Sequence, residues 1–328
     1  MRLRIKALSG GIATVLLIAI LLVWWRFDYD MKLATARTLQ GSLLAATRCG
    51  PIEYQEAGTG VPLLMVHGSG GGHDQGMAFA RSLAERGIRV IAMSRFGYLR
   101  TPMPPNLSPD ASPAAQADAH VCLLDALGIR QAAVLGGSAG GPSAMQLAIR
   151  HPDRVSALVL LVPLAYKPGA VADSSPPLPS LVETMLMRLI GSDFLFWAGT
   201  HVARNALIRL VLATPPDLVA AASVQERARV NAMLDNILPV SARVAGLRSD
   251  SVLGKGIPRY ALEAIRAPTL VISVQDDGYG TYASAQYTAN QIARAKFVGF
   301  GEGGHTWVGH DNQVQLEILK LLVPAVQP

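Results

Sequence analysis

The chain has 328 residues, half of them hydrophobic, and a formal net charge of +6 at pH 7. This length allows one large α/β domain of about 250 residues together with additional segments. The basic residues are scattered without a run of lysine and arginine, so no nucleic-acid partner is expected. Only Cys49 and Cys122 are present, which excludes a disulfide framework and a cysteine-rich metal site but leaves one bridge between them open.

The first segment is apolar and differs from everything after it. Three basic residues lie among the first six, and nineteen uncharged residues follow, from Ala7 to Trp25. This is about the length at which a helix crosses the hydrocarbon core of a bilayer. Trp24 and Trp25 lie at its far end, where aromatic rings favour the headgroup level. We therefore predict an N-terminal membrane anchor within residues 1–37, with a single transmembrane helix.

A cleaved signal peptide is the alternative, because small residues alternate at Ala34-Thr35-Ala36. That site lies nine residues beyond the apolar run and is separated from it by charges, which favours an uncleaved signal anchor. The basic N-terminal tail predicts a cytoplasmic N-terminus and an extracytoplasmic catalytic domain, periplasmic in a bacterium. Arg26, Lys32 and Arg37 follow the span and reduce this charge difference.

From Arg48 onward, short apolar runs alternate with longer stretches typical of helices, so we expect the sheet to begin near this residue. Such alternation is typical of an α/β fold with a mostly parallel sheet and helices on both faces. Most of the runs are continuously apolar, as strands covered on both faces are. Strands are predicted at residues 51–57, 62–67, 89–94, 132–136, 157–162, 269–274 and 296–300, and helices at 76–86, 112–127 and 142–150.

The alternation is lost between residues 164 and 266, where the pattern predicts several amphipathic helices. An insertion of about a hundred residues between two strands is too long for a plain crossover. We therefore predict a helical cap at 164–266 above a core formed by 48–163 and 267–323. The cap helices are expected at 181–190, 194–212, 216–222 and 223–238.

Two further features of the cap bear on access to a site. Residues 171–179 contain three prolines and two serines and are the expected hinge or entry loop. An apolar acyl or aromatic pocket is suggested by a set of cap side chains, although such residues more commonly form plain core. They are Met185, Met187, Phe194, Phe196 and Trp197.

The strongest motif is Gly136-Gly137-Ser138-Ala139-Gly140-Gly141, between a predicted strand and the helix that Pro142 opens. A Gly-x-Ser-x-Gly at such a junction is a nucleophile elbow, in which a strained turn lifts the serine hydroxyl above the sheet edge. A glycine-rich turn with a helix-capping serine is the alternative. A dinucleotide site is excluded because no Gly-x-Gly-x-x-Gly fits residues 136–141. Ser138 is the candidate nucleophile.

A serine nucleophile needs a base, and the base needs an orienting acid, in the chain order Ser, acid, His. Asp276 and Asp277 follow one predicted strand, and His305 follows the next. The carboxyl ends of strands are where open α/β sheets assemble their sites. We predict His305 as general base and Asp277, which lies farther out of its strand, as the acid. Asp276 is expected to brace the turn, and His310, the competing histidine, to begin the last helix.

The third motif is the loop His67-Gly68-Ser69-Gly70-Gly71-Gly72 after an early strand. Hydrolysis by a serine needs two backbone N–H donors for the developing oxyanion. A glycine-rich loop near the elbow can supply one, and the residue after the serine supplies the other, which nominates Ser69 and Ala139. A phosphate-binding loop is disfavoured because the Gly-Lys-Ser/Thr ending is missing. His67 is expected to have a structural role.

These motifs together resemble the α/β-hydrolase superfamily in order and spacing, over about residues 48–163 and 267–323. The matching segments are Ile52-Glu53-Tyr54 through His67-Gly68, Arg95-Phe96-Gly97-Tyr98, Leu123 to Ile129, the elbow, His151-Pro152-Asp153-Arg154-Val155 and Gly303-Gly304-His305. The resemblance implies an eight-stranded sheet, a Ser138/Asp277/His305 triad and no cofactor or metal. Residues 94–100, Ser-Arg-Phe-Gly-Tyr-Leu-Arg, depart from the more usual Asp-x-Arg-Gly-x-Gly-x-Ser.

The resemblance also narrows the chemistry. A serine at the elbow argues against haloalkane dehalogenases and epoxide hydrolases, whose nucleophile is aspartate. We expect a serine esterase that acts through an acyl-enzyme on a small-molecule substrate. Carbon–carbon bond hydrolases, peptidases and cofactor-free haloperoxidases share the triad and stay alternatives, as does a non-catalytic ligand-binding protein of this fold. The cap resembles no group that defines a substrate.

Overall fold

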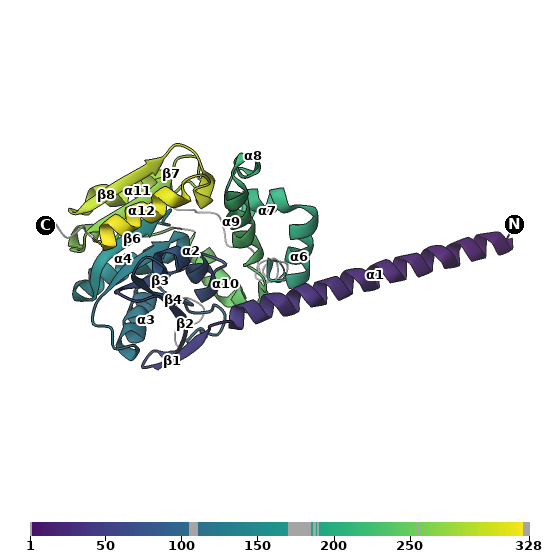
Figure 1. Cartoon of the computed structure of the whole chain (residues 1–328), viewed down its shortest axis with the longest axis horizontal. Coiled ribbons are helices and arrows are strands. Elements are labelled where there is room, and N and C mark those ends of the chain that lie inside the picture. Colours follow the sequence, from purple (N-terminus) through teal and green to yellow (C-terminus); the bar gives the residue numbers. More distant parts are fainter. Residues whose placement is uncertain are drawn as a thin grey trace.

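The computed structural model describes residues 2–104, 111–169, 185, 188, 190–254 and 256–323, with side chains from Gly11 onward. The predicted hinge at 171–179 and most of the predicted helix at 181–190 lie outside these residues. The described chain forms an eight-stranded sheet flanked by helices, a group of helices inserted between two strands, and one long N-terminal helix (Figure 1).

The sheet has the strand order β1-β2-β4-β3-β5-β6-β7-β8, with β1 and β2 antiparallel to their neighbours and the remaining pairs parallel. The seven predicted strands are confirmed, with ends shifted by at most two residues. The strands are β1 Leu43–Thr47, β2 Gly50–Ala57, β3 Val61–Val66, β4 Ile88–Met93, β5 Ala132–Gly137, β6 Val155–Leu161, β7 Thr269–Val274 and β8 Ala295–Phe300.

The first strand, β1, was not predicted, and the expectation that the sheet begins near Arg48 is wrong. Its sequence Leu-Leu-Ala-Ala-Thr consists largely of good helix formers and does not alternate. Pairing with β2 across the tight turn at Arg48 makes it the edge strand. Propensity is overruled here by a partner that lies only a few residues farther along the chain.

Both faces of the sheet are covered, because alternate residues of each strand point to opposite sides. Leu64 and Val66 of β3 face one core, beneath α3 (Pro113–Ala126), α4 (Gly141–Arg150) and α11 (Tyr282–Gln291). Leu63 and Met65 face the other core, beneath α2 (His73–Ala84) and α12 (Asp311–Leu322). This burial explains why the strands are apolar on both sides.

The residues between β6 and β7 form the helices called the cap here. They are α6 Asp193–Val202, α7 Arg204–Val211, α8 Pro216–Ala221, α9 Val224–Asp235 and α10 Val244–Leu253. The predicted helix at 194–212 is two helices, because the backbone leaves the helical region at Ala203, where φ is −142°. Neither Gly nor Pro marks this break, so no sequence signal predicts it. Helix α10 was not predicted.

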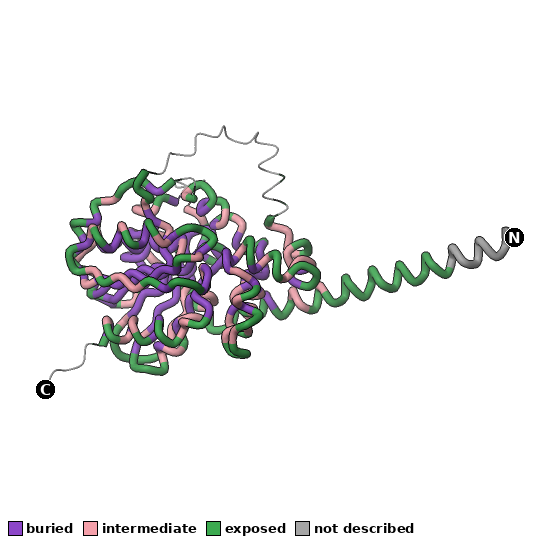
Figure 2. Tube along the Cα trace, turned by 90° about the horizontal axis from the view of Figure 1, so that it is seen from above, coloured by how far each residue is buried: buried purple, intermediate pink, exposed green. Residues whose placement is uncertain are grey.

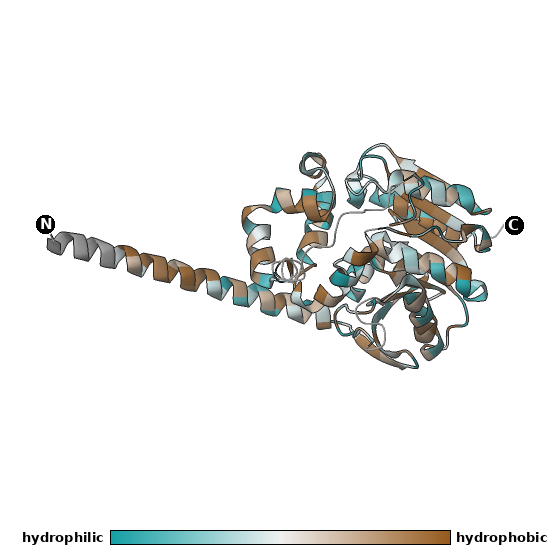
Figure 3. Ribbon diagram, turned by 180° about the vertical axis from the view of Figure 1, so that it is seen from behind, coloured by the Kyte–Doolittle hydropathy of each residue, from teal (hydrophilic) through white to brown (hydrophobic). Residues whose placement is uncertain are grey.

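A single continuous helix, α1 (Arg2–Leu39), contains the predicted membrane span. Its residues 11–26 are exposed, and the helix leaves the folded domain with its apolar part uncovered (Figures 2 and 3). Within the described residues, Gly11–Leu39 is the one stretch of helix long and apolar enough to cross a membrane.

The last third of α1 belongs to the folded domain. Phe27, Met31 and Ala34 pack into a third apolar core formed with the cap. Arg37 donates from Nη2 to the carbonyl of Leu238 at 2.5 Å. The next residue, Thr38, accepts at its carbonyl from a histidine of α2 at 2.9 Å. An anchor boundary at residue 37 therefore runs through packed helix, and the domain begins near Phe27.

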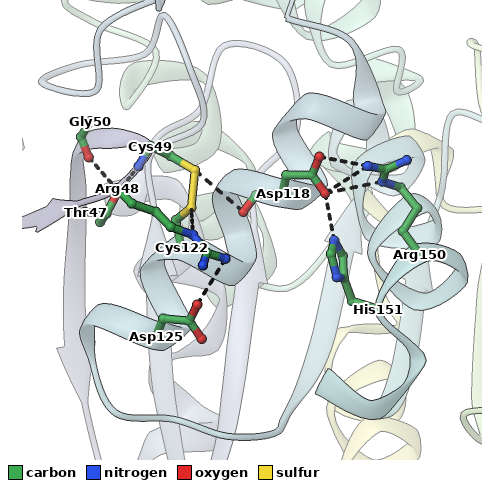
Figure 4. The surroundings of a disulfide bond; sticks show 9 residues. All are labelled: Thr47, Arg48, Cys49, Gly50, Asp118, Cys122, Asp125, Arg150 and His151. Atoms are coloured by element: carbon green, nitrogen blue, oxygen red, sulfur yellow. Dashed lines mark hydrogen bonds and ion pairs between the residues drawn. A yellow bond between two sulfur atoms is a disulfide. The ribbon is translucent and has the colours of Figure 1, made fainter.

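The two cysteines form a disulfide, which answers the question that the sequence left open (Figure 4). The Cys49–Cys122 bridge joins the β1–β2 turn to α3 across 73 residues. Arg48 adds an ion pair with Asp125 at 3.2 Å beside the bridge. The unpredicted edge strand is thus tied covalently to the helix layer beneath it.

Candidate active site

Ser138 lies in a sharp turn between β5 and α4, with φ at +48°. A non-glycine residue rarely adopts this left-handed conformation, so the turn is strained as the motif predicts. Two glycines make it possible: a Cβ at Gly136 would lie 2.6 Å from that of Ala144, and one at Gly140 would lie 2.5 Å from the carbonyl oxygen of Val66.

The structure brings the predicted serine, histidine and aspartate into one hydrogen-bonded chain. His305 Nε2 lies 2.9 Å from Ser138 Oγ, and its Nδ1 lies 2.8 Å from Asp277 Oδ2. The Asp277 side chain is fully buried, whereas the His305 ring retains 11% exposure. With Nδ1 protonated toward the carboxylate, Nε2 is free to accept the serine proton.

Asp277 is held as a carboxylate by its neighbours. Oδ1 accepts the backbone N–H of Tyr279 at 2.8 Å, and Oδ2 also accepts the hydroxyl of Thr281. Burial alone raises the pKa of Asp277, but the hydrogen bond and charge of His305, aided by these two donors, outweigh burial and lower the pKa below its ordinary value. The group opposite His305 is therefore ionised at neutral pH.

The two competing residues lie elsewhere. Asp276 Oδ1 accepts the N–H of Gly304 at 2.8 Å, so it braces the loop that carries His305. His310 stacks on Phe300 with ring centroids 4.1 Å apart and contacts the carbonyl of Glu302 at 3.0 Å. It lies directly before α12, as its position in the sequence predicted.

The glycine-rich loop lies against the elbow. A Cβ added at Gly68 would come within 3.1 Å of the Ser138 Cβ, so the loop backbone approaches the nucleophile closely. Ser69, which follows, is exposed, whereas Ala139 is buried. The backbone N–H groups of these two residues are the candidate oxyanion donors beside Ser138.

His67, at the base of this loop, is fully buried and has the structural role that the sequence predicted. Its Nδ1 lies 2.7 Å from the carbonyl oxygen of Gly68, and its Nε2 accepts the N–H of Arg95 at 3.0 Å. Burial lowers the pKa of His67 well below its ordinary value, and the Arg95 charge acts in the same direction. The ring is therefore neutral and acts as a brace for the loop.

Sequence reasoning missed a buried cluster that joins the glycine-rich loop to the cap. The guanidinium of Arg95 makes a bidentate ion pair with Asp250 of α10, at 2.8 and 2.7 Å, and also contacts the carbonyl of Gly68 at 3.3 Å. Tyr98 donates to the same carboxylate at 2.5 Å and accepts the N–H of Gly70 at 3.4 Å. Burial alone would lower the pKa of Arg95, but the Asp250 charge outweighs it and raises the pKa.

Arg95 and Tyr98, which occupy variable positions of the usual Asp-x-Arg-Gly-x-Gly-x-Ser pattern, hold the loop from the side of the cap. A second buried pair, between Arg243 and Asp74 at 2.7 Å, works in the same way, since Arg243 also donates to the carbonyl of Gly71 at 2.5 Å. Because the positions of Arg95 and Tyr98 are variable in that pattern, no motif in the sequence indicated the cluster. Asp250 lies 155 residues from Arg95 and carries no motif.

The cap also holds the loops that carry the acid and the histidine. After α7, the carbonyl of Ala213 accepts the N–H of Gly278 at 3.0 Å and that of His305 at 3.3 Å. Thr214 Oγ1 accepts the N–H of Thr306 at 3.2 Å. Two consecutive cap residues therefore fix both ends of the contact between His305 and Asp277, and no sequence pattern indicates this role.

The apolar side chains proposed to line a pocket lie elsewhere in the structure. Phe194 and Trp197 pack on the Phe27 ring of α1, with centroids 5.3 and 5.5 Å away, and Trp197 donates to Asp30 at 2.9 Å. Met185 is 62% exposed. Phe196 packs beside the same core, and Met187 lies outside the described residues. The cap aromatics thus pack on the N-terminal helix, a contact that the sequence did not predict.

No cluster of three or more histidine, cysteine, aspartate or glutamate side chains that could hold a metal occurs in the described ranges. The described site is built from side chains and backbone amides, and this arrangement suits a serine nucleophile with an adjacent base.

The comparisons with known proteins agree with the fold. Residues 61–308 match the sequence profile of the family described as "alpha/beta hydrolase fold". The chain is 30% identical to "2-hydroxymuconate semialdehyde hydrolase" of Pseudomonas sp. (strain CF600) over 254 residues, which is 76% of this chain and 82% of that protein. It is also 30% identical to "2-hydroxy-6-oxo-6-phenylhexa-2,4-dienoate hydrolase" of Comamonas testosteroni over 141 residues, 42% of this chain and 47% of that one.

Solved structures show the same fold. "Alpha/beta hydrolase fold protein from Nakamurella multipartita" superposes with a TM-score of 0.66 at 32% identity, covering 86% of this chain and 98% of its own. A structure titled as a "membrane phospholipase A, a novel bacterial virulence factor" has a TM-score of 0.63 at 21% identity. It covers 96% of this chain and 99% of its own, a larger share of this chain than the Nakamurella multipartita structure covers.

Proposed function

The chain belongs to the α/β-hydrolase fold family, and we propose that it is a serine hydrolase with Ser138 as nucleophile, His305 as general base and Asp277 as the orienting acid. The observation that carries this proposal is the unbroken chain of hydrogen bonds from Ser138 through His305 to Asp277. The strained turn at Ser138 supports it, because such strain is retained where function requires it.

In this proposal His305 Nε2 takes the proton of Ser138 Oγ as the oxygen attacks a substrate carbonyl carbon. The carbonyl electrons move to its oxygen, which the N–H groups of Ser69 and Ala139 would stabilise. The tetrahedral intermediate collapses, the leaving group departs with the bonding pair, and His305 returns the proton to it. Water, deprotonated by the same histidine, then releases the acyl group and restores Ser138.

We propose that the bond hydrolysed is a carbon–carbon bond next to a carbonyl group, rather than the ester bond expected from the sequence. The support is the names of the two relatives reported above, whose hydroxydienoic acid substrates carry an aldehyde or ketone and contain neither ester nor amide. Hydrolysis of such a compound must break a bond between carbons. The carbon leaving group is viable once the hydroxydienoic acid has tautomerised to its keto form, in which the hydroxyl proton has moved to the carbon next to the aldehyde or ketone. The electron pair of the broken bond then delocalises along the conjugated chain as a dienolate.

The test compares both chemistries in the full-length chain in detergent. Loss of the dienol absorbance of a 2-hydroxy-6-oxohexadienoate would be measured beside a series of 4-nitrophenyl esters. We expect the dienoate to have the higher kcat/KM, with Ser138→Ala abolishing turnover. Ser69→Ala is the matched control, because it keeps the backbone N–H and is expected to retain activity within about tenfold.

Each result decides between the readings. Turnover of esters without turnover of any dienoate would overturn the carbon–carbon proposal and leave the serine hydrolase in place. Absence of both activities, together with no labelling of Ser138 by a fluorophosphonate, would overturn the serine hydrolase itself.

Hydrolysis of an ester is the second candidate, and the position of α1 is the observation that favours it. Phe27 and Asp30, directly after the apolar span, contact helix α6 of the cap. A hydrolase held beside a bilayer can meet acyl esters that dissolve in lipid. Long-chain esters in mixed micelles therefore belong in the ester series, and a kcat/KM that rises with chain length would support this candidate.

We further propose that α1 anchors the chain in a membrane with the catalytic domain outside the cytoplasm. The exposed apolar side chains from Ile12 to Trp25 support a span, because none of them belongs to an apolar core of the described domain. The Cys49–Cys122 disulfide supports the orientation, since disulfides persist in oxidising compartments.

Carbonate washing and protease protection test this arrangement. The chain is expected to stay in the membrane pellet after carbonate treatment, and protease is expected to digest the domain once the outer barrier of the cell is opened. Release by carbonate, or a mature N-terminus near Arg37, would replace the anchor by a cleaved signal. Full protection from protease would reverse the orientation.

A further inference from the structure

Exposed apolar side chains lie on two consecutive helices of the cap. They are Leu195 and Val202 on α6 and Ala206 and Leu210 on α7, with Ala203 between the two helices. Leu195 is 46% exposed, Val202 85% and Leu210 72%. None of the five residues is charged. We call these five residues the cap face; soluble surfaces rarely leave neighbouring apolar side chains uncovered in this way.

The cap face lies at the depth where the anchor leaves the bilayer. Phe27 of α1, which contacts Phe194 and Trp197 of α6, comes two residues after Trp25. With a rise of about 1.5 Å per residue, this contact lies about 3 Å along the helix from the predicted end of the span. Aromatic residues such as Trp25 favour the headgroup level, so the start of α6 lies at that level as well.

The orientation of the cap relative to the anchor is fixed by contacts on both sides. α1 is one uninterrupted helix that packs on the cap through Phe27 and Met31 and is hydrogen-bonded to the domain at Arg37 and Thr38. α6 stands beside α1 at the point where the helix leaves the folded domain, on the side toward its free end (Figure 1). A bilayer around the span therefore lies against this side of the cap.

We propose that the cap face docks on the lipid bilayer that surrounds α1, with Leu195, Val202 and Leu210 seated among the headgroups. This rests on the membrane anchorage proposed above. A lipid surface is the occupant because it is what the adjoining helix enters, and because apolar side chains next to a polar helix side partition to the interface. The docked helix α7 runs directly into Ala213, which holds the loops of His305 and Asp277.

Labelling at single cysteines tests the docking in the full chain. The two natural cysteines are joined, so an introduced cysteine is the only free thiol. Val202→Cys and Leu210→Cys would carry a bimane fluorophore, with the protein reconstituted in phosphatidylcholine vesicles that contain nitroxide lipids. Leu17→Cys in α1 reports anchorage. Leu316→Cys is the matched control, because Leu316 is 50% exposed on α12, at the opposite side of the molecule from the cap (Figure 1).

We expect the lipid nitroxides to quench the labels at 17, 202 and 210 by about twofold or more, and the label at 316 to stay unquenched. Quenching at 17 without quenching at 202 and 210 would overturn the docking and leave the anchorage. An unquenched label at 17 would overturn both. Disulfide crosslinking between two Val202→Cys chains, with unquenched labels, would assign the cap face to a second copy instead.

Discussion

Replacing Asp277 by asparagine tests the site most directly, because the substitution keeps the shape of the side chain. The carboxylate accepts three donors: the Tyr279 N–H at 2.8 Å, the Thr281 hydroxyl, and His305 Nδ1 at 2.8 Å. An amide has a single acceptor oxygen, so it cannot satisfy donors on both sides. The amide therefore adopts whichever of its two orientations has the lower free energy.

The buried surroundings decide which orientation wins. If the amide nitrogen took the place of Oδ1, it would face the Tyr279 N–H, and two opposed donors in a buried site cost about 1–3 kcal/mol. If it took the place of Oδ2, it would donate to His305 Nδ1, and the imidazole would then carry its proton on Nε2. That tautomer cannot accept the proton of Ser138, and the charge that stabilises the imidazolium is lost as well.

We expect the second orientation and a fall in kcat of about 10⁴-fold, the size seen for this change in serine proteases, which corresponds to about 5 kcal/mol in the barrier. The control is Asp276→Asn, whose remaining oxygen can still accept the Gly304 N–H, and a change below about tenfold is expected there. Steady-state kcat on the best substrate of the dienoate and ester series measures both. A larger loss in Asp276→Asn than in Asp277→Asn would refute the assignment.

Three further predictions concern stability. Thr214→Val removes the acceptor of a buried backbone N–H and is expected to lower the free energy of unfolding in detergent by about 1–3 kcal/mol, as read from denaturant titration; an unchanged midpoint would contradict it. Burial lowers the pKa of His120 to about 3, so only the unfolded chain binds that proton between pH 6.5 and pH 3. The contribution of His120 to stability is therefore full above pH 6.5 and falls by about 1.4 kcal/mol per pH unit below it, and His120→Gln should reduce the measured slope by that amount; equal slopes would refute the reasoning. Deleting residues 2–25 is expected to leave a soluble domain, whereas deleting residues 2–37 exposes the cap core and should cause aggregation or a lower denaturation midpoint. Equal behaviour of the two deletions would show that the packed part of α1 adds no stability.

The sequence alone predicted seven of the eight strands and the members of the hydrogen-bonded chain. Strands buried on both faces must be apolar at every position, so they stand out as continuous runs. The strained turn at Ser138 demands small neighbours, so it has a readable motif. Because the acid and the histidine follow the carboxyl ends of neighbouring strands, their order in the chain predicts that Asp277 and His305 lie near the serine.

The unpredicted features share one property, which is that each depends on a partner outside its own segment. The Leu43–Thr47 strand, the only unpredicted strand in the sheet, needed β2, and its own residues favour a helix. Arg95 pairs with Asp250 across 155 positions, and neither residue has a local pattern that identifies the other. The boundary of the anchor was misplaced because Arg37 binds the carbonyl of Leu238, 201 residues away.

The cap shows the same division most clearly. The sequence suggested that the aromatic residues of the cap line a pocket. Aromatic side chains occur in cores, pockets and interfaces alike, so their identity alone does not distinguish these roles. Phe194 and Trp197 pack on Phe27, and only the folded chain brings these positions together. The local sequence indicates which backbone conformations a segment can adopt and which of its faces can be buried, because both depend on neighbouring residues. The pairing of one apolar surface with another depends on the packing of the whole chain, so only the tertiary structure determines it.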